Sequence, residues 1–274
     1  SRNIFHQKNL VLSQINTYTM AKADIFSKVP ELNYSEPAAK TDFEAFKTVV
    51  NSRRSIRVYE PTPIPDAVMR ECLELTLLAP NSSNLQPWEF FWVRSAEKKA
   101  ELVKLCLSQP AARTAPELIV AVARPDYWKI NRERMLELLT QNGEKGSGYQ
   151  YYKKITPLAY NLGFLNLFGF FKKGLIWFKG LTEVTPRIPT SSIELELWAQ
   201  KTTALACQNL MLSLRAAGYD SCPMEGMDGV RVKKLLDLPS QAEICMVISA
   251  GKRAAGGVYG PRIRFDSTYF IHEV

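Results

Sequence analysis

The sequence predicts a mixed α+β domain, and three observations carry that prediction. Residues 88–93, 118–123 and 244–249 are rich in aromatic and β-branched side chains, which is typical of β-strands. Residues 193–217 show the apolar periodicity of a long α-helix, and Gly218 follows at the position where helices commonly end. With 46% hydrophobic and 11% aromatic residues among 274, the chain has enough apolar side chains for a substantial core.

Two shorter helices are predicted ahead of the first strand. A polar arm over residues 1–41 leads to a helix over 42–51, whose apolar residues follow helical spacing. Thr41 or Asp42 caps the start of this helix, since both side chains can accept a hydrogen bond from a free backbone N–H group. The next helix begins after an Ile-Pro-Asp sequence and ends near Pro80, because proline cannot continue a helix.

The three strand-like runs are expected at the centre of the sheet, and the segment after Gly218 is expected to be extended. No internal repeat or low-complexity tract interrupts the chain. We therefore divide it into an N-terminal arm at residues 1–41 and one domain at 42–274, with a hydrophobic insert at about 125–190.

The insert contains an unusual apolar stretch at residues 158–181. Its uncharged run is shorter than the roughly 20 residues that a membrane-spanning helix needs, which argues against a transmembrane helix. Three interpretations stay open: a buried helix facing a second subunit, a hydrophobic lid over a substrate pocket, or an interfacial helix whose lysines meet anionic lipid headgroups. Burial is favoured because large apolar side chains usually lie inside proteins, and membrane-surface contact is not favoured.

The formal net charge of +8 and the isoelectric point near 9.2 first suggest nucleic acid as a partner. Lys and Arg are spread along the chain and are often paired with acids, so no basic tail or arm of the nucleic-acid-binding kind is present. We expect no nucleic-acid partner, and instead a solvated basic surface or arginines that converge on a phosphorylated cofactor.

The five cysteines form no C-x-x-C pair and have no clustered histidine partner. Neither a metal site nor a redox dithiol is therefore indicated, and the odd number argues against a disulfide framework. Because free thiols favour a reducing compartment and the first residues lack a secretory leader pattern, we expect the protein in the cytoplasm.

Several common catalytic designs are disfavoured. Histidine occurs only as His6 and His272, near the two ends, whereas a Ser-His-Asp or Cys-His hydrolase needs a positioned internal base. The chain has no G-x-G-x-x-G sequence, and its glycine-rich segment 251–260 lacks the Gly-Lys-Ser/Thr end of a P-loop. A Rossmann dehydrogenase and a P-loop NTPase are both disfavoured, and no glycosidase-like pair of acids can be picked out.

Three separated segments carry groups that suit a flavin. Residues 53–59 present three arginines and a serine within five positions, and guanidinium groups bind phosphate oxygens as planar forks. Residues 78–90 are rich in Asn, Ser and Gln, whose neutral groups suit ribityl hydroxyls and the ring edge. Residues 218–228 bring an extended backbone and a glycine to one place, where N–H groups can serve the flavin N5. Taken singly, each segment also fits an ordinary helix end or loop.

Taken together, the segments resemble the nitroreductase family in their order and their residues. The matching patterns are R-R-S-x-R, A-P-x-S-x-N-x-Q-P-W and G-x-x-S-C-P-x-E-G, followed by an extended C-terminal strand that carries two arginines on one face. The resemblance covers about residues 43–274. It implies an α+β, nitroreductase-like fold with a central, mostly antiparallel sheet flanked by helices, in an intertwined homodimer with FMN at the subunit interface.

The resemblance also implies which residues hold the cofactor. These are Arg53, Arg54, Ser55, Arg57, Pro80, Asn81, Ser82, Asn84, Pro223, Met224, Glu225, Gly226, Arg262 and Arg264. The first three match positions that hold the phosphate and ribityl chain, and the last two match a C-terminal phosphate clamp. The four from 80 to 84 match a loop that the second subunit contributes, with Asn81 standing where Ser is common.

The catalytic candidates implied by the resemblance are Arg57, Glu225 and Gly226. Arg57 matches the cation near N1 and O2 of the pyrimidine ring, where a fixed guanidinium stabilises the charge of the reduced flavin. Met224, Glu225 and Gly226 match the peptide beside N5 and O4.

The implied activity is an FMN-dependent oxidoreductase. It would pass electrons from NADH or NADPH through the flavin N5 to a small organic acceptor, such as a nitroaromatic, a quinone or an activated alkene, in ping-pong turnover. Two alternatives stay open. One is a reductive dehalogenase similar to iodotyrosine deiodinase, for which Tyr149, Tyr151 and Lys153 could serve as lid residues. The other is a non-enzymatic flavin carrier at a membrane surface.

Overall fold

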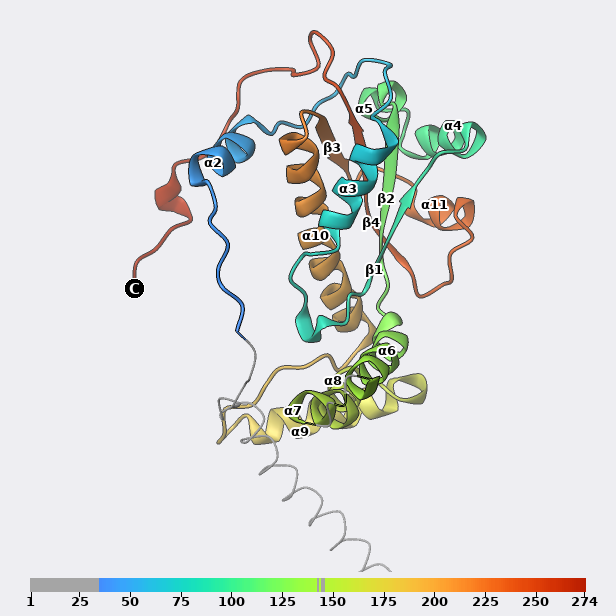
Figure 1. The fold of residues 1–274 in the computed structure, drawn as a ribbon. Helices are drawn as coiled ribbons and strands as arrows, with labels where there is room; N and C mark the ends of the chain where they lie inside the picture. Colours follow the sequence, from blue (N-terminus) through green and yellow to red (C-terminus); the bar gives the residue numbers. More distant parts are fainter. Residues whose placement is uncertain (1–34, 142, 144–145) are drawn as a thin grey trace, which may run out of the picture. The chain divides into compact units, whose positions relative to one another are not determined.

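The computed structural model describes residues 35–141, 143 and 146–274 (Figure 1). Most of the arm predicted at residues 1–41 therefore lies outside the described residues. The chain divides into two compact units. The larger unit contains residues 42–131 and 162–274, and the smaller one contains residues 35–41 and the described residues between 132 and 161.

The larger unit holds the sheet and the helices around it. Its elements are α2 (Phe43–Ser52), α3 (Asp66–Thr76), η1 (Ser82–Asn84), β1 (Trp88–Trp92), α4 (Ala96–Leu105), α5 (Pro110–Thr114), β2 (Glu117–Ala123), the start of α6 (Tyr127–Gln141), η3 (Phe164–Asn166), α9 (Leu167–Lys179), α10 (Ser192–Ala216), β3 (Asp220–Met224), α11 (Gly229–Leu235), β4 (Glu243–Gly251) and η4 (Ser267–Tyr269). The smaller unit has the rest of α6, α7 (Ser147–Gln150), the π-helix η2 (Tyr151–Ile155) and α8 (Thr156–Tyr160).

The sheet has the strand order β1-β2-β4-β3, and each neighbouring pair is antiparallel. The predicted α+β class with an antiparallel sheet is thus confirmed. The expectation that all three strand-like runs lie at the sheet centre is wrong for β1, because within the described chain β1 has a neighbour, β2, on one side only. An apolar strand composition indicates that the side chains are buried, but it does not show whether the strand has a neighbouring strand on both sides.

Both faces of the sheet are covered by helices. Along β2, Ile119 and Ala121 face the cluster formed with α3 and α10, whereas Leu118 and Val120 face the opposite cluster, which includes residues of α4 and α5. Side chains of a strand alternate between the two faces, so a strand buried on both sides reads as one continuous apolar run. Every residue of β2 is accordingly buried.

The helix ends follow local rules in most places. Asp42 caps α2, since its carboxylate accepts hydrogen bonds from the N–H groups of Glu44 and Ala45. Helix α10 ends as predicted, and Gly218 adopts a left-handed φ of +88° that suits glycine. Helix α3 stops at Thr76, ahead of the predicted end near Pro80, because the residues after it turn away towards η1.

The prediction of a C-terminal strand that carries two arginines is also wrong. Residues 261–266 belong to none of the strands of the described sheet. The guanidinium of Arg262 instead donates to the backbone carbonyls of Asn51 and Arg53, at 2.8 and 2.6 Å, and so fastens the segment to the end of α2. A segment held by side chains cannot be recognised as such from residue alternation alone.

The apolar stretch at 158–181 is exposed in the described chain. It forms the end of α8, the turn η3 and helix α9, where Phe170 is 77% exposed and Phe178 is 69% exposed. None of the described helices is long and apolar enough to cross a membrane. Apart from residues such as Tyr160 and Lys172, the described part of the chain does not bury this stretch, and burial against a second subunit stays a prediction.

A buried carboxylate joins three elements at one end of the sheet. Asp220, the first residue of β3, is 3% exposed and accepts hydrogen bonds from Arg215 in α10 and from Arg253 after β4, each at 2.7 Å. The bond to Asp220 raises the pKa of Arg253. Because a buried charge needs partners, this three-residue bridge fixes how the ends of α10, β3 and β4 meet.

We predict that Asp220→Asn destabilises the fold markedly. The amide would remove the charge that both arginines oppose, and the free energy of unfolding should fall by about 3 kcal/mol, the scale for breaking a buried ion pair. Denaturant unfolding followed by circular dichroism measures this loss. The matched control is Glu101→Gln in the exposed Glu101–Lys104 pair, which should cost less than about 0.5 kcal/mol. Equal losses in the two variants would contradict the role of Asp220.

Candidate functional site

The segment at residues 53–60 lies between β3 and the loop that follows β4. Ser55 forms a parallel bridge with Ser221, and the N–H group of Ile56 donates to the carbonyl of Ser221 at 3.1 Å. On its other side, Arg57 N–H donates to the Gly257 carbonyl at 2.8 Å. The arginine-rich segment is therefore held by backbone hydrogen bonds on both sides, and these bonds do not use its polar side chains.

Gly257 is required for this close approach. A Cβ atom at position 257 would lie 2.5 Å from the carbonyl oxygen of Val58 and 3.0 Å from that of Ala254. Backbone atoms cannot yield as a flexible side chain does, so any larger residue would push the arginine segment away from the loop.

Four arginines gather around the start of this segment. The pKa of Arg53 is lowered by burial, then by the nearby positive charges of Arg262 and Arg264, and to a smaller degree by Arg54. Arg54 donates to the carbonyl of Gly260 at 2.6 Å, so it too is turned towards the C-terminal segment. The structure thus brings together four of the residues predicted to hold a phosphate.

Within the described part of the chain, these arginines lack a carboxylate partner. Among the residues that the structure describes, none of the four arginines forms an ion pair with Asp or Glu. The side chains of Arg54, Arg262 and Arg264 donate to backbone carbonyls, which carry no net charge. Like charges held close together are unfavourable without a counter-charge, so the cluster fits a dianionic group such as the phosphate of FMN.

Arg57 lies further along the same segment, beside β3. Its guanidinium donates to the Cys222 sulfur at 3.3 Å, which fixes the half-buried side chain against the strand. Burial raises the pKa of the Cys222 thiol, and the charge of Arg57 and a hydrogen bond from Ser55 oppose that rise. Cys222 therefore stays a neutral thiol at neutral pH, and the charge of Arg57 is not cancelled by it.

The peptide at 223–226 continues β3 beyond Cys222. The Met224 side chain is buried in the core, so only its backbone can face a ligand, whereas Glu225 and Gly226 are exposed. Gln109 donates to the Gly226 carbonyl at 2.8 Å and holds the peptide in place. Pro223, half-buried, lies between Cys222 and this turn. Pro223 and Met224 are thus on the same strand as Cys222, which contacts Arg57, and Glu225 and Gly226 follow directly after that strand.

The Asn-rich loop at 80–86 is shaped by its own side chains. The Asn81 side-chain oxygen accepts a hydrogen bond from Gln86 N–H at 2.8 Å, and its amide donates to the Ala79 carbonyl at 3.3 Å. Ser83 and Asn84 adopt left-handed φ angles of 59° and 47°. Asn81 therefore has a structural role within the loop, while Pro80, Ser82 and Asn84 are exposed.

This loop and the arginine cluster lie at opposite ends of the sheet. The loop leads into Trp88, which pairs with Ala123, and Ala123 pairs with Glu243 at the start of β4. The arginine segment pairs with Ser221, which is opposite Ala250 at the far end of β4. Seven residues of extended strand separate the two ends, which is a distance of about 23 Å. Within one chain, the two groups of predicted residues therefore lie far apart along the sheet.

Several residues of the site were not predicted. Gln109, Gly257 and the Asp220–Arg253 pair all position predicted residues rather than face the ligand. Gly257 could have been suspected, since it lies in a glycine-rich segment where close backbone approach is common. The contacts of Asp220 with Arg253 and of Gln109 with Gly226 carry no sequence signal, because the partners are 33 and 117 residues apart along the chain.

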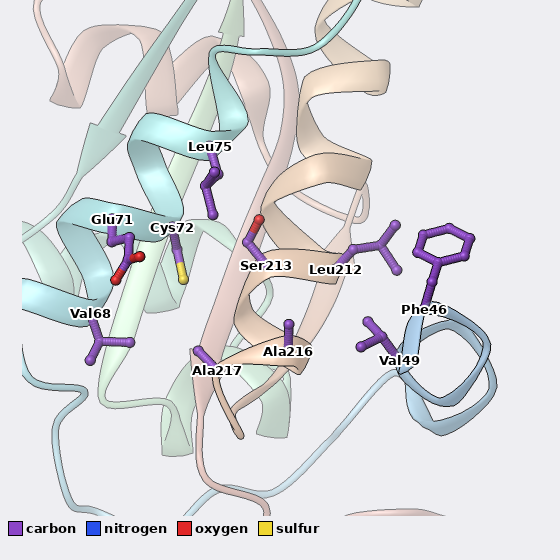
Figure 2. A pocket seen from close by; sticks show the side chains of 10 residues that line it. All are labelled: Phe46, Val49, Val68, Glu71, Cys72, Leu75, Leu212, Ser213, Ala216 and Ala217. Atoms are coloured by element: carbon purple, nitrogen blue, oxygen red, sulfur yellow. The ribbon is translucent and has the colours of Figure 1, made fainter. Parts of the chain in front are cut away.

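A separate apolar groove lies between α2, α3 and α10 (Figure 2). Its volume is about 430 Å³, and its walls include Phe46 and Val49 from α2, Cys72 and Leu75 from α3, and Leu212 from α10. The groove has no arginine in its lining. It therefore does not belong to the cluster that fits a phosphate.

Comparisons with known proteins agree on one family. The family model described as "Nitroreductase family" matches residues 50–252. A protein of Thermus thermophilus named NADH dehydrogenase is 28% identical over 220 residues, which cover 80% of this chain and 92% of that protein. A Bacillus subtilis protein, YdgI, named as an NAD(P)H nitroreductase, is 27% identical over 81% of this chain and 95% of its own length.

A solved structure gives the same fold. The crystal structure of an Exiguobacterium sibiricum protein, described as a nitroreductase in complex with FMN, superposes with a TM-score of 0.64 at 23% sequence identity. The match covers 87% of this chain and all of that one.

We predict that Gly257→Ala weakens the candidate site. The added Cβ would clash with the carbonyl oxygens of Val58 and Ala254, and the backbone would have to move to relieve the clash. Overpacking of this kind usually lowers the free energy of unfolding by about 1–3 kcal/mol. Thermal unfolding with and without added FMN measures both the lost stability and the lost stabilisation by ligand. The control is Gly260→Ala, where an added Cβ meets open space. A stronger effect at 260 than at 257 would overturn the packing argument.

Proposed function

This chain belongs to the nitroreductase family, and on that premise we propose that it binds FMN and reduces a small organic acceptor with electrons from NADH or NADPH. It is a flavin oxidoreductase by family. What is proposed for this chain is the set of residues that hold FMN, the dimer and the class of acceptor.

The observation that carries the proposal is the uncompensated cluster of Arg53, Arg54, Arg262 and Arg264. These guanidinium groups lie close enough to lower the pKa of Arg53 and have no carboxylate partner among the described residues. We assign the FMN phosphate to this cluster, with the exposed hydroxyl of Ser55 beside it as a further donor.

The remaining groups follow from the direction of the chain. Arg57 would face N1 and O2 of the pyrimidine ring, where its fixed charge stabilises added electron density. The backbone at 224–226 would face N5 and O4, and Glu225 and Gly226 are exposed there. FMN supplies transfer of two electrons between the nicotinamide and the acceptor. The protein supplies position and charge, and no side-chain acid or base is required.

We propose a homodimer with FMN at the interface. Pro80, Asn81, Ser82 and Asn84 lie on a loop that is too far from the arginine cluster of the same chain, so a second copy would have to contribute them. Large apolar side chains along the C-terminal segment are also exposed in the single chain, including Ile263, Phe265 and Ile271. Exposed apolar area of this extent favours association with another chain. A monomeric protein that binds FMN fully would contradict this part.

The acceptor is assigned only by class. We propose a nitroaromatic, a quinone or an activated alkene, since an electron-poor planar molecule can stack where the nicotinamide has left. The relatives named for NADH and NAD(P)H support a nicotinamide donor. All five cysteines are free thiols, which fits the proposed cytoplasmic location.

The dehalogenase alternative gains no specific support. Lys153 lies over the Tyr149 ring, with its Nζ 5.6 Å from the ring centre, so two of the three candidate lid residues contact each other. Release of halide from a halotyrosine under reducing conditions would establish that activity instead.

We predict that the purified protein carries, or takes up, one FMN per chain. Its visible absorbance should bleach when NADH or NADPH is added without oxygen, and the colour should return on addition of a quinone or a nitroaromatic. Stopped-flow absorbance spectroscopy measures both half-reactions separately.

The control for this test is free FMN at the same concentration, which the nicotinamide reduces far more slowly. A chain that stays colourless after incubation with FMN would refute the proposed cofactor. A chain that binds FMN but is never reduced by either nicotinamide would instead support the alternative of a flavin carrier.

We predict different defects for two arginine variants. Arg57→Ala should keep FMN but slow its reduction by at least about tenfold, because a charge that stabilises the transition state is lost. Arg264→Ala should bind FMN about tenfold or more weakly, as expected for loss of a charged hydrogen bond to phosphate, while the flavin that stays bound is reduced at a near-normal rate. Fluorescence titration and anaerobic reduction measure the two properties. Equal loss of bound flavin in both variants would contradict this division.

A further inference from the structure

Helix α9 differs from an ordinary surface helix, because its apolar side faces solvent. Successive residues of an α-helix are separated by about 100° around the axis, which sorts Leu167–Lys179 into two sides. The inner side contains Gly169 and Lys172, the two buried residues of this helix. The outer side consists of apolar residues, so the polar side chain points inwards and the apolar ones point outwards.

Contacts on the inner side fix this orientation. An added Cβ at Gly169 would collide with the carbonyl oxygen of Thr190, so the helix backbone lies directly against that segment. The Lys172 ammonium donates to the carbonyl of Pro189 at 2.8 Å. Rotation of the helix to bury its apolar side would break this bond and separate these backbones. The outward apolar face is therefore a stable feature of the fold.

The apolar face is large and continuous. It is formed by Leu167, Phe170, Phe171, Leu175, Trp177 and Phe178, and each of these side chains is at least 59% exposed. The preceding turn adds Phe164 and Leu165, which are 80% and 78% exposed. Monomeric proteins seldom expose contiguous apolar surface of this kind unless it serves an interaction.

The turn ahead of the helix supports the same interpretation. Leu165 and Asn166 adopt left-handed φ angles of 49° and 62°. Asn tolerates this conformation, whereas for a leucine it is unfavourable. This strained turn holds Phe164 and Leu165 out in solvent rather than folding them back onto the protein.

Positive charges flank the apolar face, and acidic residues are absent from the segment. Lys173 and Lys179 fall at its two edges by helical position. From residue 146 to residue 182 the sequence contains five lysines and neither Asp nor Glu, within a chain of net charge +8. An apolar face bordered by lysines is complementary to a surface with an apolar interior and anionic headgroups.

The length of the helix limits how it can meet such a surface. Thirteen residues extend about 20 Å at the α-helical rise, against about 30 Å for the hydrocarbon core of a bilayer. The helix is too short to cross, but it can lie in the plane of the interface with its lysines among the headgroups.

We propose that the outer face of α9, with the turn at 164–166, docks this protein onto anionic lipid membranes. Phenylalanine and leucine side chains insert at the boundary between headgroups and acyl chains, and Lys173 and Lys179 contact the lipid phosphates. This docking concerns a different surface from the arginine cluster and does not depend on the proposed reductase activity.

A second copy of the chain is a less suitable occupant for this face. In a two-fold contact the same surface patch meets itself, so the lysines at the edges of one α9 would lie near those of the other. The segment has no acidic residue to compensate them. Glu194, beyond the segment, lies near Lys173, and hydrogen bonds from Thr190 together with the charge of Lys173 lower its pKa. Anionic headgroups supply negative charge along the whole face, which a copy of the same segment does not.

The experiment is vesicle co-sedimentation with the purified full chain in the presence of FMN. We expect binding to vesicles of phosphatidylcholine mixed with phosphatidylglycerol, and at least tenfold weaker binding to phosphatidylcholine alone. Binding to the anionic vesicles should weaken between about 0.1 M and about 1 M salt, because salt screens the lysine contacts. Absence of sedimentation with anionic vesicles at low salt would overturn the proposal.

Matched variants locate the surface. Phe171→Gln with Phe178→Gln leaves the charge unchanged and should weaken binding at least tenfold, since each phenylalanine contributes about 1.5–3 kcal/mol on burial. The control is Leu138→Gln with Val230→Gln, which removes two exposed apolar residues from α6 and α11 and should bind as the unsubstituted protein does. Equal binding by both double variants would overturn the assignment to α9.

A second variant keeps the test valid if the phenylalanine variant misfolds. Lys173→Gln with Lys179→Gln changes two lysines of the same helix and should weaken binding to anionic vesicles about 30-fold, from about 1 kcal/mol for each lysine near the surface. Unchanged binding by this variant would contradict the proposal. Native mass spectrometry tests the other occupant: if the protein ignores vesicles and the phenylalanine variant lowers its oligomeric state, the face is a contact between copies.

Discussion

The bridge from Asp220 to Arg215 and Arg253 determines where the candidate site can form. It is a buried carboxylate shared by two arginines from different elements, one at the end of α10 and one just after β4. The bridge holds the residues after β4 against the start of β3. Residues 55–60 pair with both of these parts through short backbone bridges. Arg53, Arg54 and Arg57 lie directly before or within that segment, so their positions depend on it. The buried Asp220 bridge thus helps to position the arginines of the proposed phosphate site.

The site differs from this bridge in how its charges are balanced. At Asp220 the two positive charges share one negative charge within the protein, and the result is structural. At Arg53, Arg54, Arg262 and Arg264 the described protein supplies only carbonyl oxygens, which orient the guanidinium groups without neutralising them. A cluster of like charges lowers stability until an anion binds, so binding of a phosphate would stabilise the fold through linkage. The charge imbalance on which the proposed site rests would therefore couple binding of the proposed cofactor to stability.

The sequence predicts those features that depend on neighbouring residues, and it fails where distant residues decide. Helix α10, the cap at Asp42 and the buried run of β2 follow from periodicity and local chemistry, and all three are present. The position of β1 in the sheet and the path of Arg262 depend on which partners are available, which alternation of side chains does not encode. The site shows the same division. The residue types of the arginine segment were predictable, but the separation between that segment and the Asn81 loop appears only in the register of four strands.

Helix α9 shows why composition alone misjudges burial. Its apolar residues outnumber its lysines, and on that basis the interior is the expected environment. The orientation is determined by two less prominent residues, because Gly169 permits backbone contact with Thr190 and Lys172 forms its hydrogen bond on that same side. Burial lowers the pKa of the Lys172 ammonium to about 8, so placing this charge inside is costly, and the hydrogen bond to the Pro189 carbonyl offsets part of that cost. The polar contact therefore decides which side of the helix faces inwards, and the described residues leave the apolar side uncovered.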